Sequence, residues 1–148
     1  MANSEINFYQ CFETLARSVA PLLLKVLEEN KRVLIYSNQT QIKEIDDTLW
    51  SYGKNKFIPH ITIFDKDFDL KRQPILISNK EENSNDADYL VLTEPASESF
   101  VSGFSRVFYF YDALRAEEAK KLAKKYKPLA SKFESYKKDD VKWVKNPL

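Results

Sequence analysis

One histidine and one cysteine restrict the catalytic chemistry open to this chain of 148 residues. His60 is the only imidazole, so a metal site with two imidazole ligands is impossible, and a Ser-His-Asp triad would have to use this residue. Cys11 is the only thiol, which rules out an internal disulfide and a cysteine-based zinc site. His60 ends a rigid apolar segment, FIPH, where we expect the imidazole to tie a loop to the backbone. The alternative is a small-molecule enzyme that pairs His60 with a nearby carboxylate.

Carboxylates occur in close groups, but none of these groups has the ligand spacing of a metal site. The run around Asp65 lacks the glycine and the spacing of a calcium-binding loop. The groups lie in expected helix faces or loops, where solvation explains them: Asp46-Asp47, Asp65-Asp67-Asp69, Glu81-Glu82, Asp86-Asp88 and Asp139-Asp140. The sequence therefore predicts no metal centre.

Glycines are too few for a nucleotide site of the usual kind. Backbone amides can approach a phosphate closely only in a glycine-rich turn between a strand and a helix. The chain has two glycines, Gly53 and Gly103, and neither follows an expected strand and opens a helix. There is no G-x-G-x-x-G and no G-x-x-x-x-G-K-[ST] pattern. We therefore expect no nucleotide cofactor and no phosphate-binding loop, which favours a binding module over an enzyme.

Lysines gather in the C-terminal quarter of the chain. Residues 1–114 hold 12 Lys and Arg against 17 Asp and Glu, whereas residues 115–148 hold 11 against 5. Lys120, Lys124 and Lys127 recur at i, i+4 and i+7, so they share one face of an expected helix. This asymmetry points to an anionic partner for the C-terminal part, although a solvated lysine-rich helix would have the same composition.

The elements that position these residues alternate along the chain. Apolar runs predict strands at 6–9, 33–36, 74–78, 89–93 and 107–110. Helical periodicity predicts three helices. The first covers about 13–29, where Pro21 gives either a kink or the start of a second segment. The second begins at Asn38 or Thr40 and ends at about 52, and the third covers 115–127. We expect Asn30 and Gly53 to end the first two helices. Leu114, Ala119, Leu122, Ala123 and Tyr126 are the expected inner face of the third helix. Leu129, Phe133 and Tyr136 suggest a last helical segment.

Alternating strands and helices predict an α/β fold: a single three-layer, Rossmann-like domain over residues 1–148, with a mostly parallel sheet of about five strands. Aromatic residues make up 14% of the chain, which leaves rings available for an interface. The longest apolar run, 19–24, is too short to span a bilayer, and we expect a cytoplasmic protein.

Three short motifs follow one another in a fixed order and spacing. They are Lys31-Arg32-Val33-Leu34-Ile35, Ile45-Asp46-Asp47-Thr48-Leu49-Trp50 and Phe57-Ile58-Pro59-His60. This ordered set resembles the chi subunit of DNA polymerase III, whose members carry a basic-Arg-Val-Leu strand, a Leu-Asp-x-x-Leu-Trp helix and a Phe-hydrophobic-Pro-His turn. The later strands and the basic helix extend the resemblance over nearly the whole chain.

The resemblance implies a protein without an active site of its own. Chi-type proteins look like nucleotide-binding folds without the phosphate loop, and they couple the clamp loader and polymerase to coated single-stranded DNA. One surface binds the psi subunit of the clamp loader or a helicase-like partner. The family's aromatic partner surface matches Trp50 and Phe57 here.

A second surface in this family binds the acidic C-terminal tail of single-stranded-DNA-binding protein. Tyr126 and Lys127 match the family's aromatic-basic pair, and Lys120 and Lys124 extend the same helix face. The resemblance implies that the lysines attract the tail and that the Tyr126 ring offers it an apolar wall. The family's arginine, three residues before the aromatic, falls on Ala123, with Lys124 adjacent. The alternative for the same helix is direct binding of single-stranded nucleic acid, which the acidic remainder of the chain disfavours.

Overall fold

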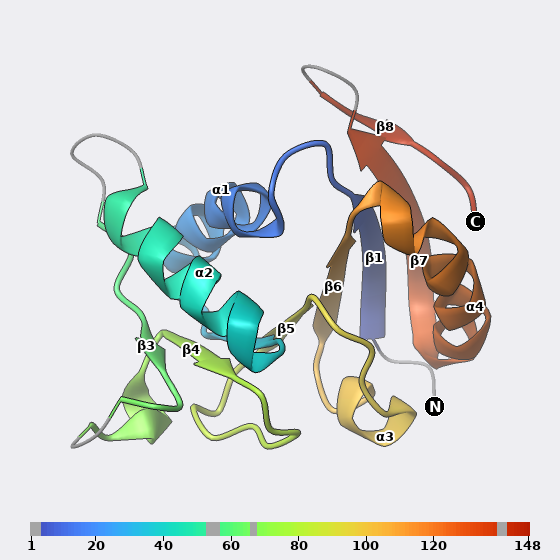
Figure 1. The fold of residues 1–148 in the computed structure, drawn as a ribbon. Coiled ribbons are helices and arrows are strands. Elements are labelled where there is room, and N and C mark those ends of the chain that lie inside the picture. Colours follow the sequence, from blue (N-terminus) through green and yellow to red (C-terminus); the bar gives the residue numbers. More distant parts are fainter. Residues whose placement is uncertain (1–3, 53–56, 66–67, 139–141) are drawn as a thin grey trace.

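The computed structural model describes residues 4–52, 57–65, 68–138 and 142–148. An eight-stranded sheet runs through the molecule in the order β3-β4-β2-β5-β6-β1-β7-β8 (Figure 1). The pair β7–β8 is antiparallel and the other pairs are parallel. The strands are β1 (Ser4–Gln10), β2 (Val33–Tyr36), β3 (Ile61–Thr62), β4 (Ile75–Ser78), β5 (Tyr89–Leu92), β6 (Arg106–Tyr111), β7 (Ala130–Lys138) and β8 (Trp143–Lys145).

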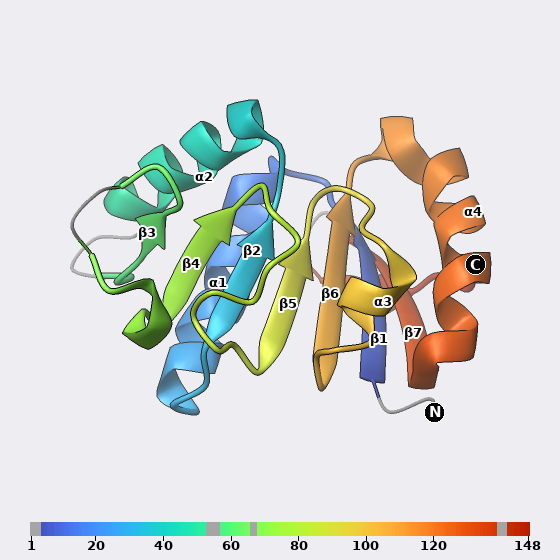
Figure 2. The same cartoon turned by 90° about the horizontal axis from the view of Figure 1, so that it is seen from below.

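Helices cover both faces of this sheet, which confirms an α/β fold with a mostly parallel sheet. On one face lie α1 (Leu15–Glu28) and α2 (Gln39–Ser51), and on the other lie α3 (Glu98–Val101) and α4 (Ala116–Tyr126) (Figure 2). Three short 3-10 turns, η1 (Leu70–Arg72), η2 (Ala113–Arg115) and η3 (Lys127–Leu129), complete the helical elements.

The continuous apolar runs of the strands divide between two cores. In β2, Val33 and Ile35 face α1 and α2, whereas Leu34 faces the opposite core. In β6, Phe108 and Phe110 join the first core, and Tyr109 and Tyr111 join the second one under α4. A strand alternates its side chains between two faces, so a strand buried on both faces is apolar throughout.

The predicted helix ends are largely confirmed. The Asn38 side chain accepts a 2.8 Å hydrogen bond from the Gln41 amide and caps α2. Asn30 takes the left-handed conformation, at φ 56°, directly after the end of α1. Pro21 lies inside α1 and does not begin a second helix. Gly53, the predicted end of α2, and Asp67, Asp139 and Asp140 lie outside the described residues.

The sheet has eight strands, not the predicted five or so. The five predicted strands correspond to β1, β2, β4, β5 and β6. Of the three additional strands, β3 has two residues and β8 has three, which is too short for a sequence period to show.

The predicted helix around Leu129, Phe133 and Tyr136 was wrong, because most of this segment forms β7. A spacing of three residues places side chains on one face of a helix but on opposite faces of a strand. Phe133 lies with its ring centroid 5.0 Å from Phe8 in one core, and Tyr136 stacks 5.4 Å from Tyr9 on the other face. Both rings therefore find aromatic partners only when the segment is extended.

Leu114, predicted on the inner face of the third helix, is instead 95% exposed. It lies in η2, where its own amide donates to the Asp112 side chain, and α4 starts two residues later. The 3-10 turn changes the angular phase of the chain, so Leu114 is not in line with the buried residues of α4. Those residues, Ala119, Leu122, Ala123 and Tyr126, are buried as predicted.

Candidate functional site: two docking surfaces on one sheet

An exposed tryptophan and an exposed phenylalanine form a ledge beside α2. Ile42, Ile45 and Leu49 form the buried stripe of α2. Trp50 follows that stripe but points outward, with 58% of its surface exposed, and Phe57 is 67% exposed. Their ring centroids are 5.9 Å apart. Trp50 therefore does not serve to cover the core beneath α2, and the two rings, here called the Trp50–Phe57 ledge, face solvent together.

His60 holds this ledge in place. Its Nδ1 lies 2.7 Å from the Ile58 carbonyl oxygen, which can only accept, so Nδ1 is the donor. Its Nε2 lies 2.9 Å from the Asp46 carboxylate on α2. The imidazole is 4.6 Å from the Trp50 ring and its side chain has no exposed surface. The predicted structural role of His60 is confirmed, and a substrate cannot reach this buried ring.

A lysine face lies on the outer side of α4. Alanine and leucine side chains of α4 are buried against the sheet, and the opposite side carries exposed lysines, namely Lys120, Lys121, Lys124, Lys125 and Lys127. Lys120 pairs with Glu117 at 3.4 Å. Lys127 Nζ donates to the Leu148 carbonyl oxygen at 2.6 Å and lies 5.5 Å from the Phe133 ring centroid. Acidic residues begin α4 and basic residues end it, as its dipole favours.

Tyr126 does not offer the exposed apolar wall that the resemblance implied, because its ring is completely buried. Its hydroxyl donates to the Ala96 carbonyl at 2.6 Å and accepts from the Ala96 amide at 2.9 Å. Burial raises the pKa of Tyr126 to about 12. Ala123, the position of the family's arginine, is also buried, at 1% exposure. Tyr126 thus anchors the end of α4, and neither Tyr126 nor Ala123 joins the exposed lysines on the surface.

The carboxyl edge of the sheet, where open parallel sheets usually bind ligands, is filled by the protein's own polar groups. The Thr93 hydroxyl lies 2.5 Å from Ser37 Oγ and 2.8 Å from Gln41 Oε1. Arg115 donates to the Thr93 carbonyl at 2.9 Å and pairs with Glu94 at 3.1 Å. These side chains satisfy one another where a nucleotide would otherwise lie. The sequence showed no motif for this network, because its members come from four separate segments.

Neither a metal site nor a membrane-spanning helix is found in the described part of the chain. No group of three or more His, Cys, Asp or Glu residues there could hold a metal ion. None of its helices is long and apolar enough to cross a membrane.

Comparisons with known proteins identify the family of this chain. The family described as DNA polymerase III chi subunit, HolC, matches residues 3–136, which is most of the chain. A protein of Rickettsia prowazekii (strain Madrid E), named "Probable DNA polymerase III subunit chi", is 26% identical over 129 residues, covering 77% of each chain. The chain therefore belongs to the DNA polymerase III chi subunit family, an accessory subunit of that polymerase.

Proposed function

We propose that this protein is a non-catalytic bridge within the replicative DNA polymerase holoenzyme. It would link the psi subunit of the clamp loader, or a helicase-like partner, to the acidic C-terminal tail of single-stranded-DNA-binding protein. The observation that carries this proposal is the separation of two chemically different exposed surfaces. The Trp50–Phe57 ledge lies beside α2 and the lysine face lies on α4, and these helices cover opposite faces of the sheet (Figure 1).

The Trp50–Phe57 ledge has the composition of an interface anchor. Large rigid rings lose little conformational entropy on binding and bury much apolar area, so tryptophan is common among residues that dominate binding energy. The contact of Trp50 with buried His60 limits the movement of its ring before a partner arrives. The psi subunit or a helicase-like protein is the partner that we assign to this surface.

The lysine face would take the acidic tail. Lys120, Lys124 and Lys127 supply positive charge along one side of α4. Within the described residues, Lys124 has no ion pair, so its ammonium group is available to a carboxylate. Lysine acts here as a point charge and lacks the bidentate geometry of an arginine. The attraction between these lysines and the acidic tail therefore falls as salt screens the charges.

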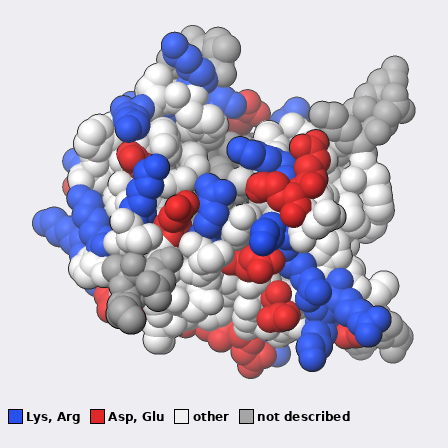
Figure 3. Space-filling model, turned by 180° about the vertical axis from the view of Figure 1, so that it is seen from behind, with Lys and Arg blue, Asp and Glu red and all other residues white. Residues whose placement is uncertain are grey.

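The face drawn in Figure 3 has basic and acidic side chains interspersed. A protein that wraps a nucleic acid needs a continuous track of positive charge along its surface. The face in Figure 3 shows no such continuous track, which disfavours extended DNA wrapped around that side of the molecule.

Binding at the Trp50–Phe57 ledge is tested with the Trp50→Ala variant. The variant and the wild type are each titrated against purified psi subunit, or against the partner protein that is recovered together with the wild type. We expect the dissociation constant to rise at least about thirtyfold, since an anchoring ring contributes 2 kcal/mol or more. Phe12→Ala is the matched control, because Phe12 is 68% exposed and lies outside the ledge. Equal affinity of Trp50→Ala and wild type would remove this surface from the proposal.

Binding of the tail is tested with a synthetic acidic peptide at low salt. We expect Lys124→Glu to abolish measurable binding and added salt to weaken the wild type, because both changes reduce the electrostatic attraction. Lys31→Glu, the same charge change at an exposed lysine away from α4, should bind as wild type does. No peptide binding at low salt, together with an unchanged Lys124→Glu, would eliminate the tail-binding role.

A further inference from the structure

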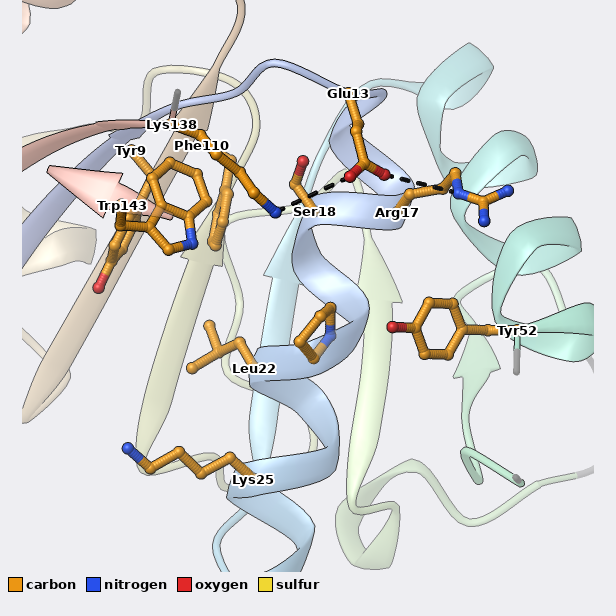
Figure 4. Close-up of a pocket in the computed structure, with 11 residues that line it drawn as sticks. Tyr9, Glu13, Arg17, Ser18, Leu22, Lys25, Tyr52, Phe110, Lys138 and Trp143 are labelled. Atoms are coloured by element: carbon orange, nitrogen blue, oxygen red, sulfur yellow. Dashed lines mark ion pairs between the residues drawn. The ribbon is translucent and has the colours of Figure 1, made fainter. Parts of the chain in front are cut away.

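A groove lies between α1 and the half of the sheet that carries β1 and β8. It has a volume of about 490 Å³ and is lined on one side by α1 and on the other by β1, β6 and the β7–β8 hairpin (Figure 4). In Figure 1 no helix covers this half of the sheet on the side of α1. The groove is separate from both the Trp50–Phe57 ledge and the lysine face.

Aromatic rings form one wall of this groove. The Tyr9 ring stacks against Phe110, with centroids 4.9 Å apart and planes 19° apart. Tyr9 also stacks on Tyr136, at 5.4 Å and 14°, and Trp143 meets Tyr9 edge-on at 5.1 Å. Tyr9 and Trp143 are half-buried, so part of each ring remains accessible from the groove. The wall is thus a surface of flat rings held at fixed angles by one another.

Positive charges surround the rings. Arg17 and Lys25 project from α1 and Lys138 from β7, and Glu13 is the only carboxylate among the described residues that line the groove. Glu13 lies between two of these cations, 3.7 Å from Arg17 and 3.8 Å from Lys138. Lys138 Nζ also lies 5.6 Å from the Trp143 ring centroid. The excess of positive charge favours an anion in the groove, and Glu13 competes with it.

The groove offers little to a peptide backbone. β1, β6 and β7 are each hydrogen-bonded to strands on both sides, so their amides and carbonyls are already paired. Only β8 lies at the edge of the sheet, and the rest of the lining is ring surface, charged side chains and the side chains of Ser18, Pro21 and Leu22 on α1. A ligand that fits has flat, apolar rings and fully ionised groups at short intervals, which is the chemistry of single-stranded nucleic acid.

We propose that the groove between α1 and the β7–β8 hairpin binds a short segment of single-stranded nucleic acid, with a base stacked on Trp143 beside the edge of the Tyr9 ring and phosphates held by Arg17, Lys25 and Lys138. The site differs from the acidic-tail surface in place and in chemistry. Lys138 and Trp143 also lie beyond residues 3–136, the part of the chain that matches the family.

The chain provides its own reporter for this site. Its two tryptophans are Trp50 and Trp143, so Trp50→Phe leaves a protein that fluoresces only from the groove. An oligodeoxythymidine of about 12 nucleotides is the probe, a length within the range that single binding modules cover. At low salt we expect saturable quenching of Trp143 fluorescence, which is reversed as salt rises. No quenching, and no change in the anisotropy of a labelled oligonucleotide, would overturn the proposal.

Variants with opposite expected effects separate binding from misfolding. Glu13→Gln removes the competing carboxylate and should tighten oligonucleotide binding by about threefold or more, a gain that an unfolded protein cannot produce. Lys25→Glu should weaken it by about tenfold, and Trp143→Ala should remove most of the binding to a labelled oligonucleotide.

Lys124→Glu on α4 distinguishes this site from the lysine face. We expect it to leave oligonucleotide binding unchanged while it abolishes binding of the acidic peptide. Oligonucleotide binding that depends on Lys124 and not on Lys25 would contradict the groove and assign the nucleic acid to α4. An acidic peptide that quenches Trp143 when the oligonucleotide does not would also overturn it.

Discussion

At the scale of single residues, His60 is the clearest case of a side chain whose chemistry is used for structure. Its two ring nitrogens connect Ile58 to Asp46, so one buried imidazole joins the loop that carries Phe57 to the helix that carries Trp50. The bond to Ile58 is buried and the bond to Asp46 is part-buried, and an unpaired polar group in the interior is costly. The only histidine of the chain is thereby committed to shaping the proposed partner surface.

His60→Phe should destabilise the protein by about 2 to 4 kcal/mol, because the ring volume is kept while both hydrogen bonds are lost and two acceptors are left unpaired. Urea unfolding measures the change. Asp46→Asn is the control, since its side-chain amide has both an oxygen and an NH2 group with which to bond Nε2, and it should cost less. A His60→Phe protein as stable as wild type would mean that these two bonds do not hold the ledge.

The buried thiol and phenol groups of the protein make its stability decrease at high pH. Burial raises the pKa of Cys11 from 9.0 to about 11, and it raises the pKa values of Tyr111 and Tyr126 to about 12. Each group ionises first in the unfolded chain. The stability from the neutral forms is therefore complete below the unfolded pKa of each group and is lost as pH rises through the folded value.

The free energy of unfolding should thus fall steadily between about pH 9 and pH 12, with the thiol contributing at the lower end. Urea unfolding at a series of pH values tests this expectation. Cys11→Ala removes the thiol contribution, so its curve should fall less steeply near the start of that range. A free energy that stays level from neutral pH to about pH 11 contradicts the expectation.

At the scale of elements, α4 depends on its last residue for its position. Tyr126 closes two hydrogen bonds with Ala96, in the loop before α3, while the rest of the helix packs through small side chains such as Ala119 and Ala123. Small side chains permit close approach but bury little area. The hydroxyl of Tyr126 therefore contributes to fixing where the lysine face lies.

Tyr126→Phe should lower stability by about 1 to 3 kcal/mol, because the ring stays packed and the Ala96 amide and carbonyl lose their partner. Hydrogen exchange should speed up in α4 and at Ala96 more than in β2. Ala123→Arg is a second test: a guanidinium placed at this buried position should destabilise the fold and not restore the family's arginine contact. Unchanged exchange in α4 in Tyr126→Phe would argue against the anchor.

At the scale of the whole molecule, the sheet separates the two proposed docking surfaces. α2 packs on one face and α4 on the other, and each has its own core. Leu49 and Ile58, the neighbours of Trp50 and Phe57 in the chain, belong to the core under α2, whereas the buried residues of α4 belong to the other core. A rigid separator of this kind lets one partner bind without disturbing the other.

Trp50→Ala and Lys124→Glu should therefore act independently. The change in binding free energy of the double variant, with both partners present, should equal the sum of the changes of the two single variants within about 0.5 kcal/mol. A double-mutant cycle, with each partner titrated alone and in the presence of the other, measures the coupling. Coupling well above that value would mean that the two surfaces communicate through the sheet.

Much of the fold could be predicted from local patterns. The strand at 33–36 and the residues that cap and end the first two helices, Asn38 and Asn30, were predicted at their observed places. Apolar runs and caps act through neighbouring residues, so the sequence shows them directly. The ordered motifs around Trp50, Phe57 and His60 also pointed to the chi subunit family, which the comparisons show.

Distant contacts determined the rest. Phe133 and Tyr136 are three residues apart, a spacing that suits a helix, and only the rings of Phe8 and Tyr9 on neighbouring β1 select the strand. Helical periodicity predicted that Tyr126 faces inward, but not that its hydroxyl bonds to Ala96, thirty residues away. Local periodicity contains no information about such partners.

By itself, the sequence determined that the chain has one imidazole and one thiol for catalysis, that its charge divides between an acidic body and a basic end, and that strands and helices alternate. Only the tertiary structure decided that the Tyr126 hydroxyl is bonded to Ala96, and that Tyr9, Phe110 and Trp143 meet beside α1 in one groove. The physical reason is that a surface is a property of packing: whether a ring faces solvent or core depends on which distant segment lies against it.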